Sequence, residues 1–596
     1  MEYLTWYNAT QAKNGNEEII EEMYGGSDSE VETEEEEVDH LFNEIEFSTD
    51  SGGLEALEAQ VEVIEDGKSF QEAAVEEQYS LVYSIFETVV WGATAPFSYI
   101  YETLSNVFYD GKNPCKQAKY ACVLQEIMSA IPDSIKILTF NEPHCLTPLQ
   151  EYLRQIVLLL NRPDDEFDDG KRTKHRDFLK LYREAINSKA YESEYMDAHS
   201  KDIAALNDIA AAIYNVRLYS FLASVVCGVI EKGYGSDHSV DIMDLTLIEQ
   251  REAIINLPQA DKAPLYVLWY NCMKGHFGIW FDPHLMGNIP HILFDLQYGD
   301  QITRFIRTGT PTIDEKDPEL TWGFRTRMAP EFLAFLRHCY DSDKKILYFN
   351  LQSAVGGAES HRSKLLKETF EDEGLKNSIF MLPHDTKYYN QSGKWEDFKN
   401  AETFKKSVVN HLIEDPNFWI PVEYQSDEDF LEELHSMMDE IHEDIFFKEE
   451  TLSQEERQDF LDIAFSQFIF VCIKYMEPDI VIPCCKDALD RAGVRTFIFM
   501  YLMMLYTNQL DRDSKRKLMV TTFGPPFLMK KQELIDERFE RLSRCHERLS
   551  NERVMENLLI RATRSGLRES VRVLMHPVDE QVFDMEEGYF ETELEE

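Results

Sequence analysis

The sequence lacks the basic residues that a nucleic-acid-binding protein needs. Its 59 lysines and arginines are outnumbered by 110 aspartates and glutamates, which gives a formal net charge of −51. A chain with this excess of negative charge repels the phosphates of DNA and RNA. We therefore expect no nucleic-acid partner.

Recognisable metal and nucleotide motifs are missing too. The ten cysteines form no CxxC pair and no zinc-ligand spacing, so neither a structural zinc site nor a disulfide framework is predicted. The phosphate-binding patterns GxxxxGK[ST] and GxGxxG are absent as well. We expect no metal and no other cofactor.

Long apolar runs are also absent. The first residues, MEYLTWYNATQAKNG, contain no basic stretch followed by an apolar one, so we expect no standard signal peptide. The apolar segments 80–104 and 213–230 are interrupted by Glu87 and Arg217 respectively, and neither supplies about twenty continuous apolar residues. We expect no transmembrane helix and, at most, peripheral contact with a membrane.

What is present divides the chain by composition. Residues 14–77 carry 23 acidic residues and a single lysine, a composition typical of disorder. The 43% of hydrophobic residues is enough for large cores elsewhere. The predicted regions are a disordered acidic segment at 1–78, a mostly helical region at 79–300, an α/β domain at 301–530, a helical extension at 531–578 and an acidic tail at 579–596.

The pattern from residue 300 onward predicts an α/β fold, a sheet flanked by helices. Short apolar runs predict strands at 344–352, 377–385 and 479–484. They alternate with helical patterns at 359–374, 459–476 and 494–510. The following region, 530–564, mixes opposite charges in a way typical of a solvated helical face.

One loop in this region has the composition of a phosphate site. In IPCCKDALDRAGV (482–494), five residues separate Cys485 from Arg491, and the loop joins a predicted strand to a predicted helix. A loop of this length can wrap one phosphate with its backbone N–H groups, while the arginine grips two oxygens. The arginine and the helix N-terminus favour the thiolate, and Gly493 lets the backbone turn into the helix.

A simpler interpretation competes with this one. Cys485 can be a buried thiol at the end of a strand, with Arg491 in an ion pair. Cys484 is expected to be buried under either interpretation, because side chains alternate along a strand.

The loop resembles the signature of the Cys-x5-Arg phosphatases, and more narrowly of those that act on phosphoinositides. Bacterial effector lipid phosphatases of the SopB and SidF kind carry Cys-Lys-x-x-Lys-Asp-Arg-Thr. This sequence matches that pattern at the four positions Cys485, Lys486, Asp490 and Arg491.

The sequence also departs from that pattern. Leu489 stands where the family has lysine, and Ala492 stands where it has threonine. The loop is also similar to the myotubularin pattern Cys-Ser-Asp-Gly-x-Asp-Arg-Thr, to which Asp487 and Asp490 correspond. Further blocks resemble effector-type phosphatase domains and lie at 304–312, 328–339, 344–353, 359–363 and 381–391.

The resemblance implies a PTP-like domain at 301–530. It implies that Cys485 is the nucleophile, that Arg491 stabilises the transferred phosphoryl group, and that Asp490 or Asp385 is the general acid. The substrate-binding residues then expected are Lys486, Asp487, Ala488, Leu489, Gly493, Arg362 and Lys387.

The expected substrate is a phosphorylated inositol lipid or a soluble inositol phosphate. Host proteins that bind the acidic segments are further expected partners, and the expected location is the bacterial cytoplasm or a host cell reached without a standard signal peptide. Two alternatives remain open. Because Ala492 lacks the usual hydroxyl and Leu489 lacks the usual charge, the chain can be a pseudophosphatase that binds phosphate with little turnover. It can also be a protein tyrosine phosphatase.

Overall fold

The structure is a computed structural model, in which the residues described belong to one compact unit of the chain. They are residues 114–163, 174–195, 200–219, 222–223, 282–285, 288–316, 324–355, 357–415, 417–530 and 534–575. The predicted disordered segment at 1–78, the acidic tail at 579–596 and the apolar segment 80–104 lie outside these residues.

Helices make up the regular structure described before the sheet. Local sequence starts two of them, because the Thr147 side chain caps α9 and the Ser200 side chain caps α12. These elements are α7 (Pro114–Ala130), α8 (Asp133–Lys136), η2 (Ile137–Phe140), η3 (Pro143–Cys145), α9 (Pro148–Leu160), α10 (Lys174–Ile186), α11 (Lys189–Tyr195) and α12 (Lys201–Tyr214).

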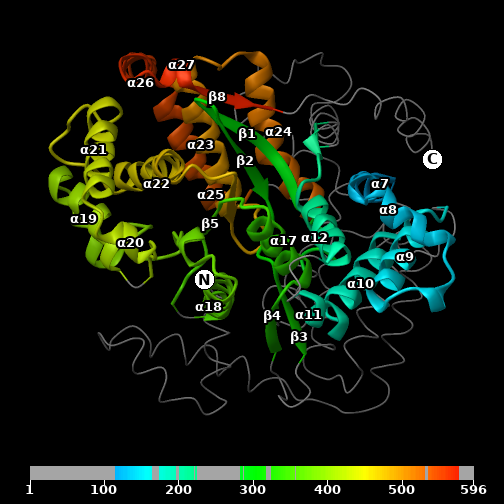
Figure 1. Ribbon diagram of the computed structural model, residues 1–596. Coiled ribbons are helices and arrows are strands. Elements are labelled where there is room, and N and C mark those ends of the chain that lie inside the picture. Colours follow the sequence, from blue (N-terminus) through cyan, green and yellow to red (C-terminus); the bar gives the residue numbers. More distant parts are fainter. Residues whose placement is uncertain are drawn as a thin grey trace, which may run out of the picture. The chain divides into compact units, whose positions relative to one another are not determined.

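A mixed sheet follows, which in the described part of the chain has six strands in the order β6-β5-β7-β2-β1-β8. Figure 1 labels β5, β2, β1 and β8 of this sheet. Neighbours from β6 to β2 are parallel, whereas β1 is antiparallel to both β2 and β8. The strands are β1 (His291–Tyr298), β2 (Gln301–Arg307), β5 (Ile346–Asn350), β6 (Ile379–Met381), β7 (Ile480–Cys484) and β8 (Val571–Leu574). The separate hairpin pairs β3 (Thr312–Lys316) with β4 (Phe324–Met328).

Helices cover both faces of this sheet. On β5, Tyr348 contacts Phe332 of α17 and Phe370 of α18, whereas the next residue, Phe349, contacts Phe468 of α22. Alternate side chains thus pack against different helices, which is why β5 and β7 are buried along their whole length. The helices of this part are α17 (Pro330–Asp341), α18 (Gly357–Asp372), η6 (Lys376–Ser378), η7 (Gly393–Trp395), α19 (Ala401–Glu414), α20 (Val422–Gln425), α21 (Glu428–Asp444), α22 (Gln454–Met476), α23 (Arg491–Thr507), α24 (Arg512–Lys530), α25 (Asp536–Leu549), α26 (Glu552–Arg564) and α27 (Leu567–Ser570).

The predicted α/β class is confirmed, and the three predicted strands and three predicted helices are present with slightly different ends. The sheet extends beyond the predicted domain on both sides, because β1 begins at His291 and β8 lies in the predicted helical extension. Among the described residues, no helix is both long enough and apolar enough to cross a membrane.

Candidate functional site

The parallel strands end at one edge of the sheet. The last residues of β2, β7, β5 and β6 are Arg307, Cys484, Asn350 and Met381. The carboxyl edge of a parallel sheet is where open α/β folds bind ligands. The Cys485–Asp490 loop lies at this edge, between β7 and α23, as the sequence predicts.

The loop carbonyls are held on the side of β2. The Thr310 N–H donates to the carbonyl oxygens of Cys485 (3.2 Å) and Lys486 (2.9 Å). Arg307 donates from Nη2 to the Asp487 carbonyl (2.8 Å) and from Nε to the Ala488 carbonyl (3.1 Å). The four successive carbonyl groups of residues 485–488 therefore point toward β2 and the residues that follow it.

This arrangement decides where the amide groups point. In a trans peptide the C=O of one residue and the N–H of the next point in opposite directions. The N–H groups of Lys486, Asp487 and Leu489 therefore point away from β2, whereas the Ala488 N–H donates back to the Cys485 carbonyl at 3.1 Å. Ala488 permits the turn by adopting a positive φ of 52°. Successive N–H groups turned to one side form a concave anion-binding surface.

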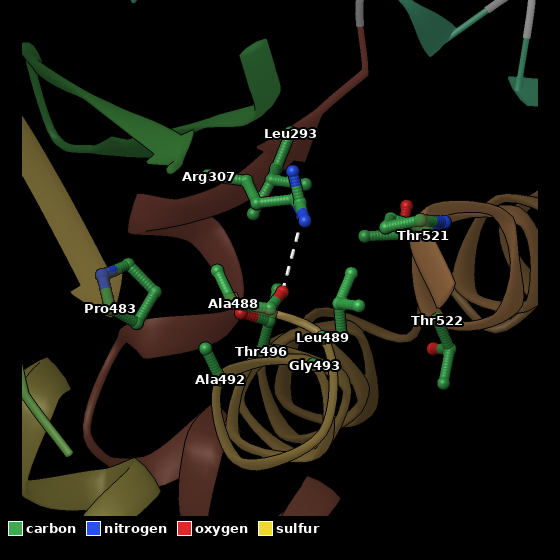
Figure 2. A pocket seen from close by; sticks show the side chains of 11 residues that line it. Leu293, Arg307, Pro483, Ala488, Leu489, Ala492, Gly493, Thr496, Thr521 and Thr522 are labelled. Atoms are coloured by element: carbon green, nitrogen blue, oxygen red, sulfur yellow. Dashed lines mark hydrogen bonds between the residues drawn. The ribbon is translucent and has the colours of Figure 1, made fainter. Parts of the chain in front are cut away.

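Arg307 is a buried cation directly behind this loop. Only 3% of its surface is exposed, and burial lowers its pKa to about 10, partly offset by its proximity to Cys485 and Asp487. It also borders a small cavity with Leu489, Ala492, Gly493, Thr521 and Thr522 (Figure 2). Cys485 and Arg491 do not line that cavity, which lies on the carbonyl side of the loop.

Cys485 and Cys484 have different surroundings. The Cys484 Sγ donates to the Thr308 carbonyl (3.1 Å), and burial raises its pKa to about 12. Cys484 is fully buried, as strand alternation predicts, whereas Cys485 begins the loop and retains 3% exposure. Both thiols are free. Cys485 thus differs from Cys484 in its position at the start of the loop, where it lies close enough to Arg491 to raise the pKa of that arginine.

Arg491, the first residue of α23, is held by a carboxylate that the sequence analysis did not select. Its Nη1 and Nη2 donate to the two carboxylate oxygens of Glu359, at 2.9 and 2.5 Å. Burial opposes both charges, yet the pairing raises the pKa of Arg491 and, with the Ser353 N–H, lowers that of Glu359. The pair fixes the guanidinium plane beside the loop.

The two candidate acids occupy different positions. Asp385 follows β6, and its carboxylate forms ion pairs with both Arg491 and Arg538. Its side chain is 41% exposed. The Asp490 carboxylate accepts the Ile535 N–H at 3.4 Å. Asp385 therefore reaches the loop arginine directly, although it lies more than a hundred residues away in the sequence.

The other predicted substrate-binding residues are divided between the cysteine loop, the first turn of α23, the segment after β6 and helix α18. Lys486 and Asp487 are half-buried in the loop, and Lys387 is exposed two residues after Asp385. Arg362 donates to the Asp314 carboxylate of the β3–β4 hairpin at 2.6 Å while only 5% exposed.

Ala488, Leu489 and Gly493 border the cavity behind the loop, and Leu489 is 1% exposed. A lysine at position 489 in this conformation would therefore be buried beside α24. The Leu489 N–H points away from β2, whereas the Leu489 side chain lines the cavity behind the loop (Figure 2).

Comparisons with protein-family models, with curated proteins and with solved structures found no match to this chain. The resemblance to phosphatases thus depends on the loop and the upstream blocks, and the geometry above is independent support for an anion site.

Three charged residues of the site were not predicted from the sequence: Glu359, Arg307 and Arg538. Glu359 stands in the same ESHRS block as Arg362, but nothing in the block shows which of its charges faces the loop. Arg307 ends a strand whose partner lies far along the chain. Arg538 lies outside the predicted domain; its only signal is the recurrence of arginine at positions 538, 541, 544 and 548.

Proposed function

We propose that this protein is a cysteine-dependent phosphatase that hydrolyses phosphate monoesters of phosphoinositides or inositol phosphates. The observation that carries the proposal is the loop in which four successive carbonyls are bonded on the β2 side, so that amide groups turn toward the opposite side. Cys485 begins this loop and Arg491 ends it. The mixed α/β sheet with the loop at its carboxyl edge supports a PTP-like fold.

In the proposed reaction the Cys485 thiolate attacks phosphorus. An S–P bond forms as the ester P–O bond breaks, and the leaving oxygen takes a proton from an aspartic acid. The loop amides and Arg491 stabilise the charge on the equatorial oxygens. Water then attacks phosphorus and gives a proton to the same aspartate, the S–P bond breaks, and inorganic phosphate and the thiolate are released.

The proposed acid is Asp385. Its contact with Arg491 brings a carboxyl group to the guanidinium that would bind the phosphate. Asp490 is the alternative, but its carboxylate accepts an N–H from Ile535, at the start of the segment leading into α25. Lys486 is proposed to favour substrates with a further phosphate near the reacting one.

A phosphate-binding protein without turnover is the second candidate. Ala492 is 2% exposed and has no hydroxyl to assist departure of the thiolate, and Arg491 already pairs with two carboxylates. These features favour binding with slow or absent hydrolysis.

Phosphate release from phosphoinositide vesicles, soluble inositol phosphates and a phosphotyrosine peptide tests the proposal. We expect release from an inositol compound by the wild type and by Cys145→Ser, which removes an exposed thiol in η3. We expect no release by Cys485→Ser, because the nucleophile is lost while the amide groups remain.

Each other outcome has a defined meaning. Headgroup binding without release by the wild type supports the pseudophosphatase. Release only from the phosphopeptide indicates a protein tyrosine phosphatase. Release that persists in Cys485→Ser, or the absence of both binding and release, refutes a phosphatase built on this loop.

A further inference from the structure

Helix α25 supplies a residue to the candidate site. Arg538 forms an ion pair from Nη2 to Oδ1 of Asp385, and its Nη1 donates to the His384 carbonyl at 3.4 Å. The Arg538 side chain is 10% exposed. The same guanidinium thus holds the backbone and the side chain of the loop that follows β6.

Arg538 is fixed by the helix that carries it. One turn further along α25, Arg541 donates from Nε to Oδ2 of the fully buried Asp462 at 2.8 Å. Arg544 then donates from Nε to Oδ1 of Asp459 at 3.2 Å. Residues three apart lie on neighbouring positions of one helical face, so these contacts with α22 place Arg538 beside Asp385.

The two oxygens of Asp385 have different partners. Oδ1 pairs with Arg538, whereas Oδ2 pairs with Nη1 of Arg491. A phosphate dianion that binds Arg491 competes with Oδ2 for that guanidinium, because both are anionic acceptors. Arg538 still holds Oδ1 after such a displacement, and Oδ2 then stays near the incoming phosphate.

We propose that Arg538 positions Asp385 so that Oδ2 leaves Arg491 to a substrate phosphate and then protonates the leaving oxygen. This rests on the proposed phosphatase function. Once released from Arg491, Oδ2 takes up a proton from solvent, and this proton moves to the ester oxygen as the P–O bond breaks. The step leaves a carboxylate still bound by Arg538. Arg538 is a positioning residue, since it touches Asp385 and not the reacting atoms.

The first test is a double-mutant cycle on anion binding, which needs no turnover. Tungstate, a tetrahedral dianion, is titrated by calorimetry into full-length wild type, Arg538→Gln, Asp385→Asn and the double variant. Without Arg538, Asp385 competes harder for Arg491, so we expect tungstate to bind about three- to tenfold more weakly, a range set by ordinary ion-pair strengths. Asp385→Asn should bind it more tightly than wild type.

The coupling between Arg538 and Asp385 distinguishes a positioning role for Arg538 from a simple effect of its charge. We expect the effect of Arg538→Gln to fall by at least half when Asp385→Asn is also present, because the competing carboxylate is gone. An equal effect in both backgrounds means that Arg538 acts only through its charge and overturns the proposal. Arg548→Gln removes the same charge from the far end of the same helix, where Arg548 contacts Asp459 and Glu456, and we expect it to leave tungstate affinity unchanged.

The second test compares leaving groups. General-acid assistance contributes on the order of a hundredfold for a poor leaving group, so Arg538→Gln should lower kcat for an inositol phosphate by at least about tenfold. It should hardly change kcat for p-nitrophenyl phosphate, whose leaving group departs without a proton. Equal losses for both substrates indicate a merely structural role and contradict the proposal.

The two proposals fail in distinguishable ways. Hydrolysis that persists in Cys485→Ser removes the phosphatase proposal whatever Arg538 does. Tungstate binding with no coupling between Arg538 and Asp385 removes the positioning proposal alone. If wild type binds no tungstate and releases no phosphate, both are wrong.

Discussion

Gly309 shows how closely the residues after β2 approach the loop. A Cβ atom at this position would lie 2.5 Å from Nδ2 of Asn288 and 3.0 Å from the Lys486 carbonyl. Asn288 is itself engaged, because Nδ2 donates to the Asp487 carbonyl at 2.9 Å. Any side chain at position 309 therefore displaces an atom that holds the loop in place.

Gly309→Ala is predicted to destabilise the protein and weaken anion binding together. We expect a loss of about 1–3 kcal/mol in the free energy of unfolding, typical of a strained substitution at a packed site, and weaker tungstate binding. Urea denaturation and calorimetry measure the two effects.

Gly493→Ala is the matched stability control. A Cβ at Gly493 has no atom within 4 Å, and the residue lies in the first turn of α23, where alanine is the better helix former. We expect its stability to be equal to or greater than that of wild type. Similar losses in both variants would contradict the close approach described for Gly309.

At this scale the sequence predicts local relationships well. The spacing of Cys485 and Arg491 places both at one loop, and alternation correctly buries Cys484. The partners Arg307 and Glu359 could not be predicted, because their contacts arise where strands and loops distant in sequence meet. The roles of these residues in binding or chemistry stay predictions.

Among the elements, α25 differs most from its expected environment. Its mixed charges suggest a solvated face, but Arg538 and Arg541 are buried with Leu542 and Cys545. The expectation of a solvated face is wrong for this helix because α22 presents buried carboxylates at Asp459 and Asp462. A sequence pattern cannot show that a second helix supplies the opposite charges.

Arg541→Met is predicted to destabilise the protein strongly. Asp462 is fully buried between Arg541 and Arg495, so loss of one guanidinium leaves a buried carboxylate with half of its charged partners. Removing one member of such a buried pair costs about 3–5 kcal/mol. Urea denaturation measures the change.

Arg548→Gln serves as the control on the same helix. The Arg548 side chain is 25% exposed, and partly exposed ion pairs contribute only about 0–1 kcal/mol. A loss for Arg541→Met no larger than that for Arg548→Gln would show that α25 is not anchored through Asp462.

The whole molecule contains buried histidines that resist protonation. Burial first, and nearby cations second, lower the pKa of His291 to about 3 and of His546 to about 4. The pKa of His384 is lowered well below its usual value for the same reasons. Below about pH 6.5 these histidines therefore bind more protons in the unfolded chain than in the folded one, and their contribution to stability falls as the pH falls through this range.

His546→Gln is predicted to flatten the pH dependence of stability. With a pKa of about 4 in the folded state, His546 should reduce wild-type stability by about 2 kcal/mol between pH 7.5 and pH 5, and the variant should lack this loss. Urea denaturation at both pH values measures it. The wild type and His546→Gln share all other charges, so the difference between their pH dependences reports on His546 alone. An equal change in the free energy of unfolding with pH in both proteins would contradict the prediction.

For the whole molecule, the sequence predicts the α/β class of the fold but not which segments complete the sheet. The alternation of strands and helices indicates the sheet, and the parallel strands β5, β6 and β7 are found where expected. The strands β1, β2 and β8 of the sheet were missed, as was the β3–β4 hairpin. The pairing of β1 with β8 joins His291–Tyr298 to Val571–Leu574, and such long-range pairing leaves no local pattern in either segment.

The long sequence separation between the paired strands β1 and β8 affects how the protein is synthesised. The β1 strand leaves the ribosome long before its outer partner, and at about 5–20 residues per second its free edge waits on the order of 15 to 50 s. An unpaired strand edge is a template for association with other nascent chains. A chaperone that shields this edge during translation would improve the yield, and a product truncated before Arg538 would contain the cysteine loop without the arginine that holds Asp385.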